Sequence, residues 1–234
     1  MVYSICGFNV EYTPKYPRLR DRSEKYLAED ASVDIDISFE VTEEEIDEHL
    51  KTYDVTRDLA EYVLAGKTFY EKIISKGAFF LHSAALSVDG YGFMFTGPCG
   101  AGKSTHATLW RKYFKENVIS VNDDKPVIRI IDGTPYVCGT PFSGKFDINA
   151  NVMVPLCGIS ILSQTPENTI EKVESSKAIS VLMEQTLRPK DPINMLNLMG
   201  LLDETLRKVP VYSFGCNISP KAVELSYTTM KPSE

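Results

Sequence analysis

A glycine-rich segment, residues 97 to 105, is the part of the chain whose residue types and spacing most directly predict chemistry. It reads GPCGAGKST and matches the phosphate-loop pattern G-x-x-x-x-G-K-[ST] without a mismatch. In such a loop the glycines let successive backbone N–H groups turn towards phosphate oxygens, and the next helix adds the positive end of its dipole. The segment therefore predicts nucleotide binding, with ATP as the expected cofactor. The expected binding residues are Gly97, Pro98, Cys99, Gly100, Ala101, Gly102, Lys103, Ser104 and Thr105.

Two side chains of this segment have separate expected roles. Lys103 brings a positive charge to the outer phosphates, and the Ser104 hydroxyl is the right length to ligate Mg²⁺. The alternative interpretation is a glycine-rich turn with an incidental lysine. The flanking residues argue against this alternative, because the apolar run YGFMFT precedes the loop and a helical pattern from 105 to 115 follows the loop. Strand, loop and helix are the context that a phosphate loop needs.

A pair of carboxylates follows the next predicted strand. Val118–Val121 reads as a short buried strand. Asn122 follows it, and then come Asp123 and Asp124, about 20 residues beyond Lys103. If this strand is a parallel neighbour of the strand before the loop, the carboxylates lie at the same sheet edge as the loop. One could then hold Mg²⁺ or its water while the other accepts a proton from an attacking hydroxyl. The alternative interpretation is a plain Asp-Asp turn.

A histidine in the strand before the loop is the third candidate. Asp-Gly at 89–90 separates two strand-like runs and predicts a two-residue hairpin turn. The register then puts His82 opposite Gly97, one strand spacing of ~4.8 Å from the mouth of the loop. His82 could ligate a second metal or hydrogen-bond the transferring phosphoryl group, or be a core histidine. The other two histidines, His49 and His106, are interpreted as a surface residue and a helix residue.

The remaining pattern predicts an α/β fold, a phosphate-loop-containing mixed sheet with flanking helices, over residues 77–234. Strand-like apolar runs alternate there with segments of helical periodicity. Asp191-Pro192 and Ser219-Pro220 are typical helix starts. The expected strands are 79–88, 91–96, 118–121, 125–131, 135–139, 152–162 and 211–216, and the expected helices are 105–115, 176–187, 192–208 and one from 220 onwards.

Residues 1–76 predict a small β/α addition packed on this core. Two strand-like pieces, 2–12 and 33–41, flank a polar stretch. Thr42 and Glu45 fit a capping box that opens a short acidic helix. From 56 to 75, apolar residues recur near helical spacing, which predicts an amphipathic helix packed on the following sheet. The stripe consists of Leu59, Val63, Tyr70 and Ile73.

Charge and composition exclude several classes of function. Across 234 residues, 25 Lys and Arg stand against 32 Asp and Glu, a net charge of −7 that gives no basic field for nucleic acid or anionic lipid. The apolar runs are too short to cross a bilayer, and the N-terminus lacks a secretory pattern. Five widely spaced cysteines without a C-x-x-C pair fit neither a zinc site nor a disulfide framework. We expect a cytoplasmic protein without nucleic-acid or membrane partners.

Taken together, LHSAA, the hairpin, GPCGAGKST and VNDD resemble the nucleotide-binding core shared by HPr kinase/phosphorylase and ATP-dependent phosphoenolpyruvate carboxykinase. The resemblance covers residues 79–131, about a quarter of the chain. It implies that His82 lies near the metals and that Lys103 and Ser104 are the loop lysine and hydroxyl. It also implies that Asp124 is the more direct metal ligand and Asp123 the base or water-holder, an assignment that could be swapped.

The chain also departs from both relatives. The carboxykinases are much longer and carry arginines and a lysine for their carboxylate substrate that have no counterpart here. HPr kinases carry an LEIRGLG-type segment, linked with the phosphate-driven reverse reaction, that is absent. Near that place stands GTPFSGK, residues 139–145, which either closes over phosphate or acceptor or is a plain turn. We therefore expect neither decarboxylation nor phosphorolysis.

The sequence thus predicts an ATP- and Mg²⁺-dependent kinase that phosphorylates a hydroxyl of a small molecule or of a protein serine. The alternatives are a non-catalytic ATP-binding regulatory protein and a simple ATPase of the same fold. Retention of both Asp123 and Asp124 favours catalysis, because binding alone needs the loop but not a base. The identity of the acceptor, homo-oligomer formation and the pathway stay open.

Overall fold

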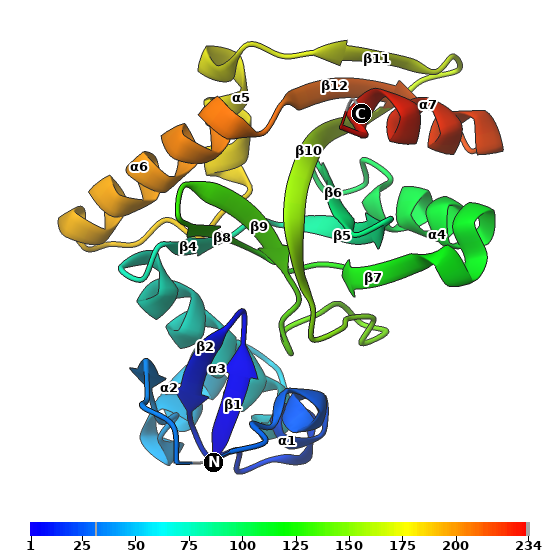
Figure 1. Ribbon diagram of the computed structural model, residues 1–234. Helices are drawn as coiled ribbons and strands as arrows, with labels where there is room; N and C mark the ends of the chain where they lie inside the picture. Colours follow the sequence, from blue (N-terminus) through cyan, green and yellow to red (C-terminus); the bar gives the residue numbers. More distant parts are fainter. Residues whose placement is uncertain (31, 233–234) are drawn as a thin grey trace.

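A long strand, β10 (Met153–Gln164, 12 residues), joins the two parts of the main sheet. Its first residues pair antiparallel with β9, and its later residues lie parallel to both β6 and β12. The computed structural model, which describes residues 1–30 and 32–232, shows this nine-stranded mixed sheet with the order β4-β8-β9-β10-β6-β5-β7, from which β12 and β11 branch at β10 (Figure 1). The other strands are β4 (Ala78–Phe80), β5 (Ser83–Val88), β6 (Tyr91–Thr96), β7 (Val118–Asn122), β8 (Val127–Ile131), β9 (Thr134–Cys138), β11 (Thr169–Lys172) and β12 (Val211–Cys216).

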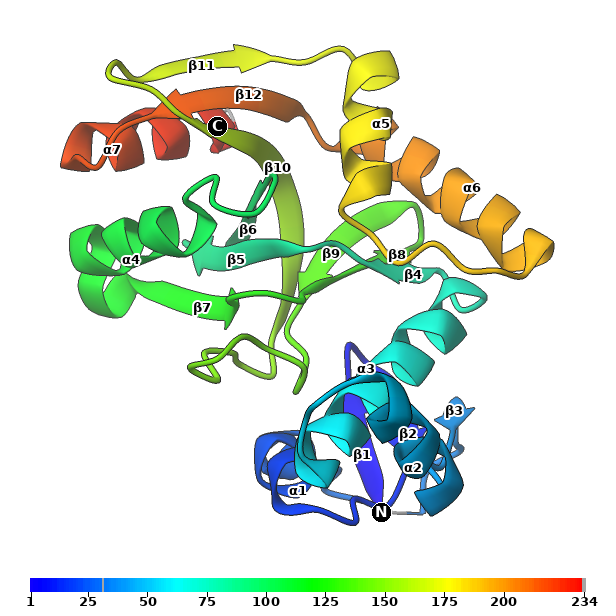
Figure 2. The ribbon, with the colours of Figure 1, turned by 180° about the vertical axis from the view of Figure 1, so that it is seen from behind.

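Alternation along β6 decides which helices cover which face of this sheet. Phe93 and Phe95 belong to the same buried cluster as Trp110 of α4. Met94, which points the other way, belongs to a second cluster with Ala178 of α5. As a result α4 and α7 cover one face, and α5 and α6 cover the other (Figure 2). These elements are α4 (Lys103–Phe114), the short η2 (Lys115–Asn117), α5 (Ser175–Glu184), α6 (Pro192–Lys208) and α7 (Pro220–Met230).

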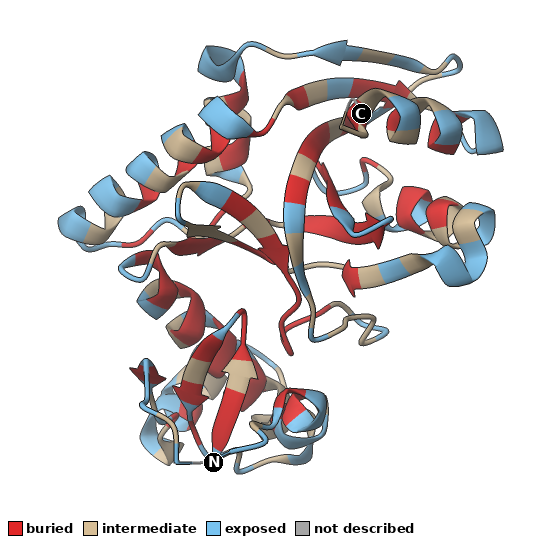
Figure 3. Ribbon diagram, in the orientation of Figure 1, coloured by how far each residue is buried: buried red, intermediate tan, exposed pale blue. Residues whose placement is uncertain are grey.

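The predicted mixed α/β architecture is present, and so is the hairpin between β5 and β6. Asp89 and Gly90 both have positive φ, 54° and 80°, as a two-residue turn matched to the strand twist requires. Val88 pairs with Tyr91 at the turn, so the predicted register is confirmed. β5 is buried along its whole length (Figure 3).

Two expectations about these strands are wrong. The run 79–88 is not one strand, because the ladder breaks at Leu81 and His82, whose N–H groups donate to Pro126 O and Gln185 O. β7 is not a parallel neighbour of β6: it pairs antiparallel with β5, which lies between them. β7 is also an edge strand, and its first three residues are half-buried or exposed. Since β5 is antiparallel to both β6 and β7, the carboxyl ends of β6 and β7 still lie at the same edge.

The N-terminal residues form a three-stranded sheet covered by helices. Thr42 and Glu45 make both hydrogen bonds of the predicted capping box. The sequence reading missed α1, because this helix lies in the polar stretch and buries little apolar surface besides Leu19; the signal was Pro17 at its first position. The elements are β1 (Val2–Ile5), β2 (Phe8–Glu11), α1 (Pro17–Ser23), η1 (Glu24–Tyr26), β3 (Ile37–Ser38), α2 (Glu43–Thr52) and α3 (Arg57–Ile74).

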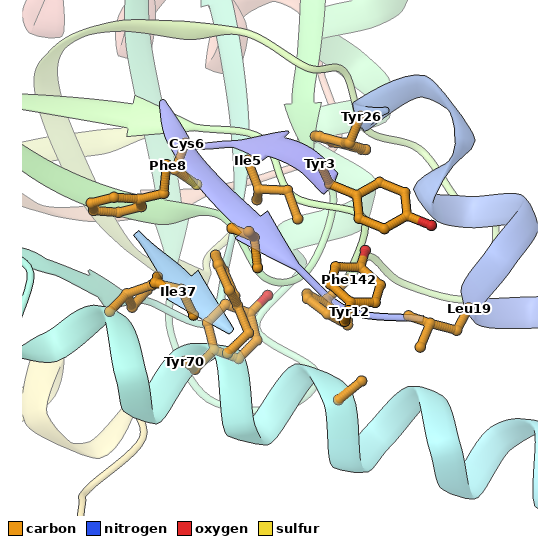
Figure 4. Packing of buried hydrophobic residues seen from close by; sticks show 14 of the residues in the cluster. Tyr3, Ile5, Cys6, Phe8, Tyr12, Leu19, Tyr26, Ile37, Tyr70 and Phe142 are labelled. Atoms are coloured by element: carbon orange, nitrogen blue, oxygen red, sulfur yellow. The ribbon is translucent and has the colours of Figure 1, made fainter. Parts of the chain in front are cut away.

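Helix α3 joins this N-terminal part to the main sheet. Its Tyr70 packs in one cluster with Tyr12 of the N-terminal part and with Phe142 of the segment after β9 (Figure 4). The two parts therefore share buried side chains, and a domain boundary at residue 76 stays a prediction. Val63, expected in the buried stripe, is 43% exposed instead. None of the described helices is long and apolar enough to cross a membrane.

Two glycines, Gly139 and Gly200, give a matched test of how closely the backbone packs after β9. A Cβ at Gly139 would lie 1.8 Å from Ala150 O and 2.7 Å from Val121 O, both backbone atoms, whereas one at Gly200 in α6 meets nothing within 4 Å. We expect Gly139→Ala to lower the free energy of unfolding by about 3 kcal/mol or more. Gly200→Ala should raise it by about 1 kcal/mol, through helix propensity. Urea denaturation checks both, and equal effects would contradict this packing.

Candidate functional site

The loop between β6 and α4 has a backbone that only glycines adopt without strain. Gly97, Gly100 and Gly102 have φ of 137°, 81° and 101°, and Gly102 is the residue directly before the first turn of α4. A Cβ at Gly97 would lie 3.1 Å from Leu162 O, so the loop also passes close to β10. The predicted succession of strand, loop and helix is present, with α4 beginning at Lys103 and not at residue 105.

Lys103 folds back over this loop. Its ammonium group donates to Gly97 O at 2.8 Å and to Pro98 O at 3.2 Å. Burial lowers the pKa of Lys103, while the neighbouring Cys99 and the negative charge of Asp124 oppose this shift. The amine is therefore held at the loop, within the electrostatic reach of Asp124. Ser104 is exposed beside it, at the start of α4.

His82 lies against the carboxylate of Asp124. Its Nε2 is 3.1 Å from Asp124 Oδ1, and Lys125 contacts the other carboxylate oxygen. Burial by itself would raise the pKa of Asp124, but the hydrogen bond from His82 and the charge of Lys125 outweigh it and hold this pKa well below its usual range. Asp124 is consequently an ionised carboxylate near neutral pH.

Asp123 is in the opposite electrostatic environment. Burial raises the pKa of Asp123, and the hydrogen bond from Gly144 N to Oδ1, 2.7 Å long, offsets only part of that effect. The charge of Asp124 raises the pKa of Asp123 further. Two adjacent carboxyl groups with pKa values shifted apart are suited to different roles, the one with the raised pKa being the stronger base.

Backbone contacts connect these groups to the loop. Thr96, the last residue of β6, donates its hydroxyl hydrogen to His82 O at 2.9 Å, and Ser83 N donates to Asp124 O at 3.2 Å. Two strand spacings, about 10 Å, thus separate the start of the loop from the acidic pair. The structure brings His82 and Asp124 into direct contact and puts Lys103 at the same sheet edge.

Asn122 is a site residue that the sequence reading did not single out. It is fully buried, and its Nδ2 donates to Thr140 O at 3.1 Å and Phe142 O at 3.2 Å. Its Oδ1 accepts from Asp124 N at 2.9 Å and Lys125 N at 2.7 Å. The amide therefore fixes the turn that carries both carboxylates to the segment after β9. An Asn directly before two acids is the available signal, since Asn often bonds to backbone two residues on.

The segment 139–145, whose role the sequence left open, contacts the acidic pair through Gly144. A Cβ at Gly144 would lie 3.0 Å from both carboxylate oxygens of Asp123, so glycine permits this approach. Two residues of the N-terminal part make hydrogen bonds to the segment 139–145. Ser143 N donates to the Tyr62 hydroxyl at 2.7 Å, and Arg22 donates to Ser143 O at 3.2 Å. The position of Asp123 thus depends on contacts reaching back to α1 and α3.

A cavity of about 370 Å³ opens beside the loop, at the ends of β10 and β12. That volume falls in the range of small-ligand sites. His106 lies in its wall, 2% exposed; it accepts a hydrogen bond from Trp110, and burial lowers its pKa to about 4, so the ring is neutral at pH 7. Among the described residues, His106 Nδ1 is the one buried side-chain nitrogen or oxygen atom that makes no hydrogen bond. The lining includes Ala101, Thr105, His106, Leu109, Gln164 and Asn217.

The donor set at the acidic pair fits Mg²⁺ shared with phosphates. Within residues 1–30 and 32–232, no three His, Cys, Asp or Glu side chains gather into a metal-binding group. Mg²⁺ needs fewer protein ligands, because it binds one or two oxygens and takes the rest from water and phosphate. Ser104 and Asp124 offer such oxygens. His82 already contacts Asp124, which suits an orienting role, and its direct ligation of metal stays a prediction.

No protein-family profile and no curated protein sequence matches the chain. Among solved structures, the chain is similar to the HPr(Ser) kinase/phosphatase from Coxiella burnetii, with a TM-score of 0.35 and 14% sequence identity. The match covers 64% of this chain and 94% of that one. A likeness of this degree shows neither membership of that family nor its activity.

From the opposite pKa shifts of Asp123 and Asp124 we predict how substitutions at these residues change the free energy of unfolding in metal-free buffer at pH 7. Asp123→Asn should raise the free energy of unfolding, because it removes a desolvated charge whose pKa folding raises. Asp124→Asn should lower it by about 2 kcal/mol, because two charge-assisted contacts are lost.

Both effects should depend on pH with a definite sign. The gain from Asp123→Asn is complete above the folded pKa of Asp123 and should disappear once the pH is well below the unfolded value of ~3.9, where the wild-type carboxyl is protonated in both states. The loss from Asp124→Asn should persist at pH 5 and shrink only below pH ~4. Denaturant titrations at several pH values check this, and equal destabilisation by both variants would contradict it.

Proposed function

We propose that the protein is an ATP-dependent kinase that transfers the γ-phosphoryl group to a hydroxyl of a small molecule or of a protein or peptide serine. The observation that carries the proposal is the pair of adjacent carboxylates with opposite pKa shifts, Asp123 and Asp124, at the sheet edge where the glycine-rich loop begins. Phosphoryl transfer requires little more than positioning, charge neutralisation and a group that orients or deprotonates the acceptor.

Each side chain has a role in this proposal. The loop residues 97–105 hold the phosphates, and Lys103 leaves its contacts with Gly97 O and Pro98 O to meet the outer phosphates. Ser104 and Asp124 hold Mg²⁺, which neutralises phosphate charge when bound. His82 orients Asp124 through their 3.1 Å contact.

Asp123 accepts the proton of the acceptor hydroxyl. Its raised pKa makes it the better base of the pair, and the Gly144 N–H keeps the carboxylate in one orientation. The cavity beside Thr105 and His106 is suited to the nucleoside, because it adjoins the second half of the loop. The acceptor then approaches from the His82 side.

A first prediction from this proposal concerns the nucleotide. Lys103→Ala should lower the affinity for Mg-ATP at least tenfold in calorimetry without loss of the fold, because the ammonium contacts only loop carbonyls. Lys112→Ala, an exposed lysine on the same helix, is the matched control and should leave the affinity unchanged. Equal affinity in wild type and Lys103→Ala would exclude the nucleotide site.

A second prediction concerns the reaction. With labelled ATP, purified protein should transfer phosphate to a serine-containing small molecule or peptide, and Asp123→Asn should lose transfer by at least 100-fold while still binding ATP. Phosphate incorporation into RNA alone would refute the acceptor class. Steady ATP hydrolysis with every acceptor absent would favour a simple ATPase, and ATP binding without turnover would favour a regulatory protein.

A further inference from the structure

A second cavity opens on the acceptor side of the candidate site. It has a volume of about 380 Å³ and is lined by His82, Asp124 and Lys125 together with Phe80 and the end of α5. We name it the reaction cavity. Because it contains the His82–Asp124 contact, an acceptor that enters this cavity meets Asp124, the neighbour of Asp123.

A smaller cavity adjoins the reaction cavity, since Phe80 and Lys125 line both. It has a volume of about 210 Å³, and α3 forms one of its walls. We name it the apolar pocket. It lies where α3 passes the main sheet, and Tyr70 and Phe142 of its wall are among the side chains in Figure 4. Its wall consists mainly of Tyr62, Val63, Tyr70, Phe80, Phe142 and Leu187.

The two tyrosine hydroxyls of this wall are already engaged within the protein, and the ammonium groups of its two lysines, Lys67 and Lys125, lie near Glu71 and Asp124. The Tyr70 hydroxyl donates to Lys125 O at 2.9 Å, and the Tyr62 hydroxyl accepts from Ser143 N at 2.7 Å and lies 3.2 Å from Pro141 O. An incoming group therefore meets ring faces and aliphatic atoms. A polar group in this pocket would lose its water without gaining partners, whereas an apolar group gains by leaving water.

Val63 marks the mouth of the apolar pocket. The helical stripe in the sequence predicts a buried residue here, yet Val63 is 43% exposed and borders the pocket. An apolar side chain that is uncovered beside a cavity is available to contact an apolar ligand bound there. Gly66, one turn further along α3, also lines the pocket and leaves room beside Phe142, whose ring a Cβ would approach to 3.0 Å.

We propose that the acceptor of the phosphoryl group carries an aromatic or branched aliphatic group, which occupies the apolar pocket while its hydroxyl lies in the reaction cavity at Asp124, next to Asp123. This inference rests on the proposed kinase function and adds the chemical class of the acceptor. Cavities of about 150 Å³ hold a benzene ring, so the pocket accommodates one ring or one leucine-sized group.

The test compares acceptors that share a hydroxyl and differ in the apolar group. N-benzoylserine and N-acetylserine are titrated by calorimetry in the presence of Mg²⁺ and a non-hydrolysable ATP analogue. We expect N-benzoylserine to bind at least tenfold more tightly. The same comparison with the peptides Gly-Phe-Gly-Ser-Gly and Gly-Ala-Gly-Ser-Gly tests whether the ring comes from a free compound or from a peptide, and a tenfold preference in either pair supports the proposal.

Variants at Val63 test whether this pocket causes the preference. Val63→Trp should fill the pocket, and Val63→Asp should put a charge at its mouth; each should reduce the preference for the ring to less than threefold. Because Val63 is 43% exposed, both should fold, which circular dichroism checks. Ile193→Trp, a similar change at a residue 69% exposed on α6, is the control and should keep the preference.

Binding and transfer are measured separately, so failure of the kinase function is distinguishable from failure of this inference. A ring preference that the Val63 variants abolish supports the pocket as a ligand site even if no phosphate is transferred. Equal binding of the benzoyl and acetyl compounds and of both peptides would overturn the inference. A ring preference that survives both Val63 variants would also overturn it, because the ring would then bind elsewhere.

Discussion

The side-chain amide of Asn122 is the interaction on which the geometry of the candidate site depends. It is buried at the end of β7 and holds backbone atoms from two segments, the turn at Asp124 and Lys125 and the strand exit at Thr140 and Phe142. Each of these groups would be costly to leave unpaired in the interior. The turn and the segment therefore keep one relative position, which brings Gly144 N to Asp123.

That constraint separates two chemically identical neighbours. Asp124 faces His82 and Lys125, which favour its charge, whereas Asp123 accepts a backbone N–H that offsets only part of the effect of its burial. The turn after Asn122 directs these two adjacent side chains to different partners. The separation matters because an ionised carboxylate suits a cation and a more basic one suits a proton.

Much of this arrangement was predictable from short-range patterns. The Asp-Gly turn at 89–90 fixed the hairpin register, and the loop motif predicted strand, loop and helix in the right order. The insertion of β5 between β6 and β7 was not predictable, because strand order depends on contacts distant in sequence. Nor were the contacts of Tyr62 and Arg22 with Ser143, which join residues about 80 and 120 positions apart. The uncovered Val63 departs from its periodicity because a cavity, not a neighbouring element, lies beside it.

The central claim, that one turn makes Asp123 a base and Asp124 an ionised anchor, is tested most directly by carbon-13 NMR titration of the two side-chain carboxyl carbons in the metal-free protein. We predict that the pKa of Asp123 lies above the usual aspartate value of ~3.9 and that of Asp124 below it. Two coincident titrations near the usual value, or the reverse order, would contradict the account.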